Sequence, residues 1–135
     1  MMSINVQTKR VYEPAERGDG VRILIDRLWP RGLRKQDAKI SLWLKQIAPS
    51  AELRRWFDHR PERWETFQRR YIAELDDRSE AVEAVAAAAR GGKVTLLYGA
   101  RDMIRNHAVV LARYLRRKLQ RHEAVFRRYQ RLRHR

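Results

Sequence analysis

The chain has 135 residues, a length that fits one domain with one core. Apolar residues make up 44% of it, which is enough to fill that core and excludes a disordered chain. The formal net charge is +15, and such a charge predicts attraction to polyanions but says nothing about fold. The absence of cysteine excludes a disulfide scaffold and a thiolate metal site.

Neither the amino terminus nor the interior predicts a membrane protein. Residues 1–9 are mixed polar, and no run approaches the roughly 20 apolar residues that a spanning helix needs. We therefore expect a cytoplasmic protein without a membrane span. The four histidines have no metal-ligand spacing, so no metal is expected, and no motif names a cofactor or an oligomeric state.

The first third of the chain predicts strands. Residues 9–12 have extended character, and Gly18 and Gly20 indicate a flexible turn after them. Residues 21–25 are nearly continuous apolar and β-branched, as in a central strand that is covered on both faces. Residues 33–47 fit both strand alternation and helical spacing, so they are assigned to neither.

The middle of the chain predicts three helices. Ser50 is expected to cap a helix that ends near His59, and Pro61 is expected in the first turn of a second helix. Ser79 is expected to cap an alanine-rich third helix, which Gly91 and Gly92 stop. The second helix has an apolar stripe at spacings of three and four, formed by Trp64, Phe67, Tyr71 and Leu75.

Residues 94–98 predict the second strong strand, which a loop and a helix over about 106–115 follow. Helices that alternate with strands are typical of α/β proteins. We therefore predict a small, mainly parallel sheet flanked by helices, with a single α/β domain over residues 1–115. Residues 116–135 would form a basic C-terminal helical extension.

Polar side chains follow both predicted strands. After the first come Asp26, Arg27, Trp29 and Arg31, and after the second come Tyr98, Arg101, Asp102, Asn106 and His107. Parallel α/β sheets bind ligands outside the carboxyl ends of their strands, and a helix N-terminus favours anions. If the two strands are neighbours, Arg27 and Arg31 face one crevice. These residues therefore predict a pocket for a small anionic ligand that carries phosphate or carboxylate.

Each of these residues also has a purely structural interpretation. Asp26, Arg27 and Arg31 would then form an internal salt-bridge network, with Trp29 packed in the core. Asn106 would cap a helix and His107 would cap or pack. Tyr98 would be a buried residue with its hydroxyl group satisfied. Both interpretations stay open at this stage.

Catalytic templates find little support. No serine stands at a strand-to-helix elbow, and a thiolate nucleophile is absent. An enzyme that uses Asp26, Asp102 or His107 as acid or base stays open, but no spacing singles it out. The residues therefore leave any activity undetermined.

The quoted segments recur together in one known family. They read VRILIDRLWPRG, LWLKQIAPSAELRRWF, RPERWETF, VTLLYGARD and NHAVVL, in this order between about residues 9 and 115. With them the chain resembles the YeaO-like branch of the family named domain of unknown function 488. The resemblance implies a small α/β domain of unassigned function, and the residues after Leu115 lie outside it.

The chain departs from that family at two places. Broader relatives carry cysteines at the positions of Tyr98 and Asn106, and this chain has neither. It also has Ile104 and Arg105 where the branch usually shows Glu and His, so the resemblance implies no role for that pair here.

The last twenty residues, 116–135, carry nine basic side chains against Glu123 alone. They predict a basic amphipathic helix that would bind nucleic acid without sequence preference, as a non-catalytic alternative function. An acidic membrane or a partner helix are further interpretations, and a packed, solvated terminal helix is the structural one. The residues expected to contact phosphates are Arg116, Arg117, Lys118, Arg121, Arg127 and Arg128.

Overall fold

One four-stranded parallel sheet lies at the centre of the protein, in the order β1-β4-β2-β3. The structure is a computed structural model that describes residues 5–133. Residues 1–4 of the predicted domain and residues 134–135 of the predicted extension therefore lie outside the described residues. The strands are β1 (Val6–Arg10), β2 (Val21–Leu24), β3 (Leu42–Trp43) and β4 (Val94–Tyr98). The predicted α/β class with a parallel sheet is therefore confirmed, and the two strongest predicted strands are direct neighbours.

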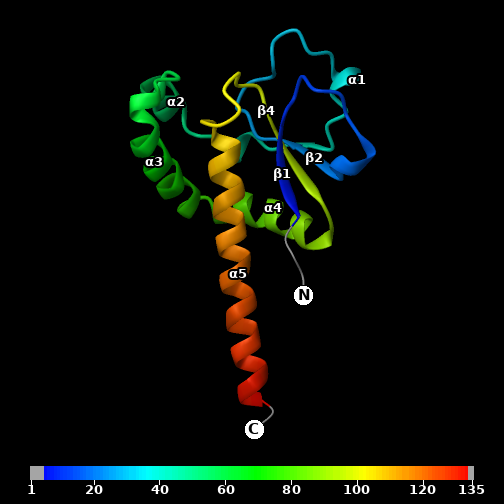
Figure 1. Ribbon diagram of the computed structural model, residues 1–135, viewed down its shortest axis with the longest axis vertical. Helices are drawn as coiled ribbons and strands as arrows, with labels where there is room; N and C mark the ends of the chain where they lie inside the picture. The colour runs from blue at the N-terminus through cyan, green and yellow to red at the C-terminus, as the bar shows by residue number, and fades with distance from the viewer. Residues whose placement is uncertain (1–4, 134–135) are drawn as a thin grey trace.

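The helices follow the strands as α/β connectivity requires. They are α1 (Lys35–Ala38), α2 (Ala51–Phe57), α3 (Trp64–Asp76), α4 (Ser79–Gly91) and α5 (His107–Arg133), with single 3₁₀ turns at Arg17–Asp19, Lys45–Ile47 and Pro61–Arg63. The unassigned segment 33–47 thus contains α1, β3 and a 3₁₀ turn, which explains its mixed pattern. Figure 1 shows α5 running past β1 and projecting beyond the other elements.

Two of the predicted caps have different outcomes. The Ser50 side chain accepts a hydrogen bond from the Leu53 N–H, so its predicted role at the start of α2 is confirmed. The prediction for Ser79 was wrong, because Ser79 is the first residue of α4 and Arg78 holds the cap position. The Arg78 guanidinium donates to the Ala48 carbonyl oxygen, and this contact ties the short α3–α4 turn to the segment before α2.

The larger core lies between one face of the sheet and the helices. Alternate strand residues such as Ile23 and Leu96 pack there against apolar positions of α3, α4 and α5. The Tyr71 hydroxyl donates to the Ile47 carbonyl oxygen over 2.7 Å, and burial raises the pKa of that hydroxyl far above its ordinary value. A smaller cluster around Leu24 and Leu97 covers part of the opposite face.

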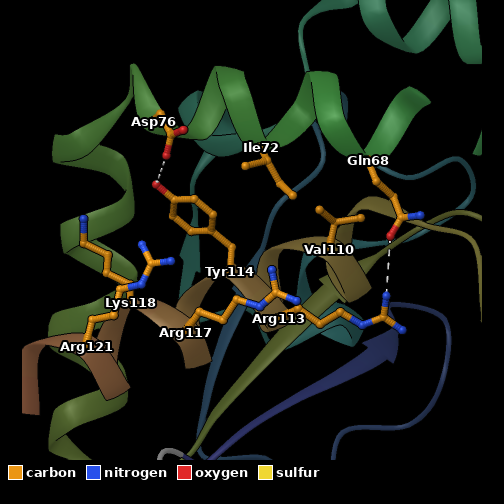
Figure 2. A pocket seen from close by; sticks show the side chains of 9 residues that line it. All are labelled: Gln68, Ile72, Asp76, Val110, Arg113, Tyr114, Arg117, Lys118 and Arg121. Carbon is orange, nitrogen blue, oxygen red and sulfur yellow. Dashed lines mark hydrogen bonds between the residues drawn. The ribbon is translucent and has the colours of Figure 1, made fainter. Parts of the chain in front are cut away.

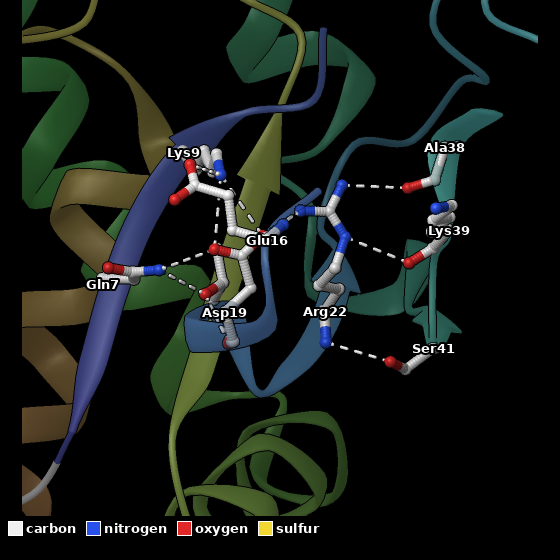
Figure 3. A network of polar contacts seen from close by, with 9 residues as sticks. Gln7, Lys9, Glu16, Asp19, Arg22, Ala38, Lys39 and Ser41 are labelled. Carbon is white, nitrogen blue, oxygen red and sulfur yellow. Dashed lines mark hydrogen bonds and ion pairs between the residues drawn. The ribbon is translucent and has the colours of Figure 1, made fainter. Parts of the chain in front are cut away.

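The rest of that opposite face carries a buried polar network (Figure 3). Asp19 is only 3% exposed, and it pairs with Arg22 of β2 and Lys9 of β1. The carboxyl pKa of Asp19 is lowered, because a backbone N–H from Glu16 and the two cations together outweigh the effect of burial. The turn predicted as flexible is therefore held in place by ion pairs, and we call Lys9, Asp19 and Arg22 the Asp19 network.

Gly20 connects this network to β2. Its φ of 64° lies in the left-handed region, and an added Cβ would lie 2.2 Å from the Lys93 carbonyl oxygen. That oxygen already accepts the Val21 N–H, which begins the pairing of β2 with β4. Only glycine fits this position without moving the sheet.

Helix α5 continues through the predicted boundary at Leu115. Leu111, Leu115 and Leu119 are buried against the core, so packing extends four residues beyond that boundary. Further along, α5 exposes large apolar side chains, namely Val125, Phe126, Tyr129 and Leu132. Within residues 5–133, no helix has the length and apolarity that crossing a membrane requires.

Candidate functional site

A cleft of about 430 Å³ opens where β2 and β4 end. It is lined by the loop after β2, by α2 with the residues on either side of it, and by the loop between β4 and α5, together with Tyr12 and with Phe67 of α3. Of the nine residues predicted for a ligand site, the cleft brings together Asp26, Arg27, Trp29, Arg31, Asn106 and His107. This is the edge at which parallel sheets bind ligands.

Asp26 and His107 form the part of the cleft wall that joins the two strand ends. The Asp26 Oδ2 atom accepts the Gly99 N–H over 2.9 Å, and His107 Nε2 lies 2.9 Å from Asp26 Oδ1. That buried oxygen has no other polar partner within residues 5–133. His107 Nε2 also lies 3.1 Å from the Ile25 carbonyl oxygen, so both of its neighbours are acceptors and this nitrogen carries the proton.

Among the cleft arginines, only Arg105 has a carboxylate partner within the described residues, Asp102 at 3.5 Å. Neither Arg27 nor Arg31 forms an ion pair with a carboxylate in the described part of the chain, so the internal network of the structural interpretation does not form. Arg27 donates from Nη2 to the Pro49 carbonyl oxygen over 3.3 Å, and its Nε atom is buried without a hydrogen-bond partner among the described residues. Arg31 is exposed, and its backbone oxygen accepts a hydrogen bond from the Tyr12 hydroxyl.

Three predicted residues lie outside the cleft lining. Tyr98 is 3% exposed and belongs to the larger core, where burial raises its pKa. The Asp102 carboxylate accepts the Arg105 and Ile104 N–H groups in the loop, and these bonds lower its pKa. Arg101 is exposed. Each of these side chains therefore serves the local fold or faces solvent instead of the cleft.

Asn106 and Trp29 line the cleft and also stabilise its walls. The Asn106 Oδ1 atom accepts the Val109 N–H, which caps α5, and its Nδ2 donates to the Asp102 carbonyl oxygen. The Trp29 Nε1 donates to the Leu33 carbonyl oxygen over 2.6 Å, and its ring meets the Trp43 ring edge-on. Both residues hold the loops that carry the arginines.

Sequence reasoning missed several residues of the cleft. Arg54 comes from α2, and no pattern in the sequence places that helix beside the end of β2. Arg105 replaces a family residue and was given no role, although its side chain lines the cleft. Other lining residues that were missed include Tyr12, Leu28 and His59, together with Phe57 and Phe67. The hydrogen bond from Arg27 to Pro49 joins the loop after β2 to the segment just before α2, the helix that carries Arg54. The sequence gives no sign of this contact.

A second concave surface lies between α3 and α5, also with a volume of about 430 Å³ (Figure 2). Its cations are Arg113, Arg117, Lys118 and Arg121, of which Arg113 donates to Gln68 over 3.4 Å. The only carboxylate in its lining is that of Asp76, which accepts the Tyr114 hydroxyl over 2.6 Å. Burial together with this bond raises the pKa of Tyr114 to about 12. We call this surface the α3–α5 groove.

The other basic residues predicted to bind nucleic acid lie in different surroundings. Arg116 donates to the Val6 carbonyl oxygen over 2.7 Å, and Arg127 pairs with Glu123 over 2.6 Å. Arg128 is exposed. The six residues therefore do not form one surface, and three of them, Arg117, Lys118 and Arg121, belong to the α3–α5 groove.

The fold and the cleft define a class of protein: a small parallel α/β protein with an arginine-lined cleft at the carboxyl edge of its sheet. Among residues 5–133, no three His, Asp or Glu side chains gather as a metal site would require.

The chain belongs to the DUF488 family, because residues 5–130 match the branch described as "Inactive DUF488-N3 subclade". This match extends beyond Leu115 into the basic extension. The uncharacterized protein YeaO of Escherichia coli K12 is 47% identical over 113 residues, which cover 84% of this chain and 98% of YeaO. The uncharacterized protein Rv3073c of Mycobacterium tuberculosis H37Rv is 44% identical over 110 residues, covering 82% of this chain and 92% of that protein. No solved structure matches the chain significantly.

Proposed function

We propose that the cleft at the ends of β2 and β4 binds a small anion that carries phosphate or carboxylate, without covalent chemistry. The observation that carries this proposal is the set of cleft arginines, Arg27, Arg31, Arg54 and Arg105, which stand against one carboxylate in the same lining, that of Asp26. Asp102, outside the lining, pairs with Arg105, so these four guanidinium groups exceed the carboxylates of Asp26 and Asp102 by two positive charges. An anion would supply the acceptors that the protein does not.

The individual contacts support the same proposal. Asp26 accepts the Gly99 N–H and lies 2.9 Å from His107, and it forms no ion pair with an arginine in the described residues. The Arg27 Nε atom is buried without an acceptor in the described part of the chain, and a buried donor left unpaired costs about 1 to 3 kcal/mol. A bound oxyanion within reach of this edge of the guanidinium would remove that cost.

The chemistry of the cleft supports binding rather than turnover. The chain has no cysteine, and Tyr98, at one of the two positions where broader relatives carry one, is buried in the core. Asn106, at the other position, is used to cap α5. The description of the family branch as inactive agrees with a binding role.

Calorimetric titration of the full chain with inorganic phosphate tests the proposal. Arg31→Gln and Arg54→Gln should each weaken binding by about 1.5 to 3 kcal/mol, because each removes a charge-assisted hydrogen bond. Arg128→Gln is the matched control, since Arg128 is an exposed arginine of α5 outside the cleft lining. Equal affinities in all three variants would refute the proposal.

A second candidate function is sequence-indifferent binding of nucleic acid through α5. The α3–α5 groove favours it, because Arg117, Lys118 and Arg121 lie together there without ion-pair partners in the described residues. A backbone phosphate is the group such a cluster would contact.

Duplex DNA affinity at several salt concentrations tests this second candidate. Replacement of Arg117, Lys118 and Arg121 by Gln should flatten the log–log salt dependence by roughly 0.9 for each phosphate contact that is lost. Arg54→Gln serves as the control and should leave the slope unchanged. If the triple variant keeps the wild-type slope, the groove does not contact DNA.

A further inference from the structure

We propose that the preferred ligand of the cleft is an anion attached to an apolar, ring-sized body, such as an aryl phosphate, and not a free inorganic ion. This inference rests on the proposed function and deepens it by naming the ligand class. It comes from the parts of the cleft lining that the arginines do not explain.

The cleft is larger than a single inorganic ion requires. A volume of about 430 Å³ lies within the range of roughly 300 to 1,000 Å³ that is typical of small-molecule sites. One inorganic oxyanion, bound by two or three guanidinium groups, would leave most of this space to water. A ligand that fills the cleft has a body beyond its charged group.

The walls of the cleft carry apolar surface. Leu28 lines the cleft and is 59% exposed, although it lies in a loop and has no part in either core cluster. The neighbouring Trp29 and Pro30 continue this wall, and Ala48 and Pro49 line the cleft from the segment before α2. Such walls offer water no hydrogen bonds, whereas an apolar group buried against them is stabilised by about 25 cal/mol per Å² of apolar surface removed from water.

The cleft has buried aromatic rings and exposed arginines in different parts of its lining. Phe57 and Phe67 line the cleft yet are 7% and 3% exposed, so their rings can contribute only to its floor. The two rings are stacked with centroids 4.4 Å apart, which fixes their positions. Arg31, Arg54 and Arg105 are exposed and therefore contribute near the mouth. A ligand with its ring against the apolar wall and floor and its anionic group beside the arginines at the mouth matches both regions.

Calorimetry with three probes separates the two ligand parts: inorganic phosphate, phenyl phosphate and phenol. We expect phenyl phosphate to bind the full chain at least about tenfold more tightly than phosphate, since about 1.4 kcal/mol of ring burial corresponds to a factor of ten. Phenol should bind more weakly than phenyl phosphate, because it lacks the charge that the arginines attract.

The Leu28→Ser variant tests whether the ring of the ligand binds in the cleft. It should weaken phenyl phosphate binding by a factor of about three to ten and leave phosphate binding unchanged, because it removes apolar contact without altering a charge. Leu28 is exposed, so this change should not affect folding. Leu132→Ser is the matched control, because Leu132 is an exposed leucine far along α5.

The outcomes distinguish this inference from the proposed function. If phosphate binds as tightly as phenyl phosphate, the inference fails and the proposed function stands. If phenol binds as tightly as phenyl phosphate, or if no probe binds, both fail. A Leu28→Ser variant that binds phenyl phosphate like the wild type would also overturn the placement of the ring in the cleft.

Discussion

The Asp19 network and the arginine cleft use the same residue types in opposite ways. In the Asp19 network every charge has a buried partner: Arg22 pairs with Asp19 and donates to two carbonyl oxygens, and Lys9 bridges Asp19 and Glu16. In the cleft, Arg27 and Arg31 lack any carboxylate partner within the described residues. Charges that the fold satisfies itself stabilise the fold, whereas converging charges that it leaves unsatisfied are available for a ligand.

Removal of Asp19 should have the largest effect on stability. Asp19→Ala leaves the Arg22 guanidinium buried without its counter-charge, and breaking a buried pair in this way costs about 3 to 5 kcal/mol. Urea denaturation measures the loss. Arg31→Gln is the control from the cleft and should change the free energy of unfolding by less than about 0.5 kcal/mol, as is usual for an exposed side chain. Similar losses in both variants would erase the distinction between the two regions.

The same network predicts a stability loss in acid. The Asp19 pKa is lowered in the folded state, so its contribution to stability is complete above the unfolded value of about 3.9 and disappears as pH falls through the folded value. The unfolding free energies of wild type and Asp19→Asn should therefore differ by a constant amount above about pH 4 and converge below it. A difference that grows with acidification would have the wrong sign for this account.

Two truncations of α5 separate its structural part from its exposed part. Ending the chain after Leu115 removes the buried Leu119 and the bond from Arg116 to Val6, so we expect a loss of about 2 to 5 kcal/mol. Ending it after Gln120 keeps both, and we expect a loss below about 1 kcal/mol. Thermal and urea melts of the two truncated chains compare them directly. Equal stability of the two would place the structural boundary at Leu115, as the sequence predicted.

A methyl group at Gly99 should have the smallest effect. Its Cβ would lie 2.9 Å from Asp26 Oδ2, the atom that accepts the Gly99 N–H. Because a carboxylate can rotate away, the cost is that of the hydrogen bond, about 0.5 to 1.5 kcal/mol. Gly18→Ala is the control, since its Cβ would meet nothing within 4 Å. Phosphate affinity of Gly99→Ala should also fall, because a displaced Asp26 turns its charge toward the arginines.

Much of the fold was readable from the sequence, because parallel strands buried on both faces are continuous apolar runs. Residues 94–98 form β4 within the limits predicted, and residues 21–25 contain β2. The Asp19 network was not readable, since an aspartate between two glycines is also the pattern of an exposed turn. Its burial depends on Arg22 and Lys9, which lie in two different strands.

The candidate site was predicted only in part, for a similar reason. Residues that directly follow β2 could be assigned to the carboxyl edge of the sheet from their place in the chain. Arg54 could not, because the position of α2 beside that edge depends on tertiary packing. Tyr98 was predicted to belong to the site, but its side chain lies on the core face of the sheet. Successive residues of a strand point to opposite faces, so the last residue of a strand and the first residue of the following loop face different ways.

We propose that the cleft, and not the basic end of α5, is the anion site. The most direct measurement is a ¹H–¹⁵N correlation spectrum of the full chain titrated with phenyl phosphate. We predict saturable shifts of the backbone amides that border the cleft, those of Arg27, Gly99 and His107 among them, with little change at residues 121–133. Shifts confined to residues 113–133, with the amides of the cleft unmoved, would contradict the account.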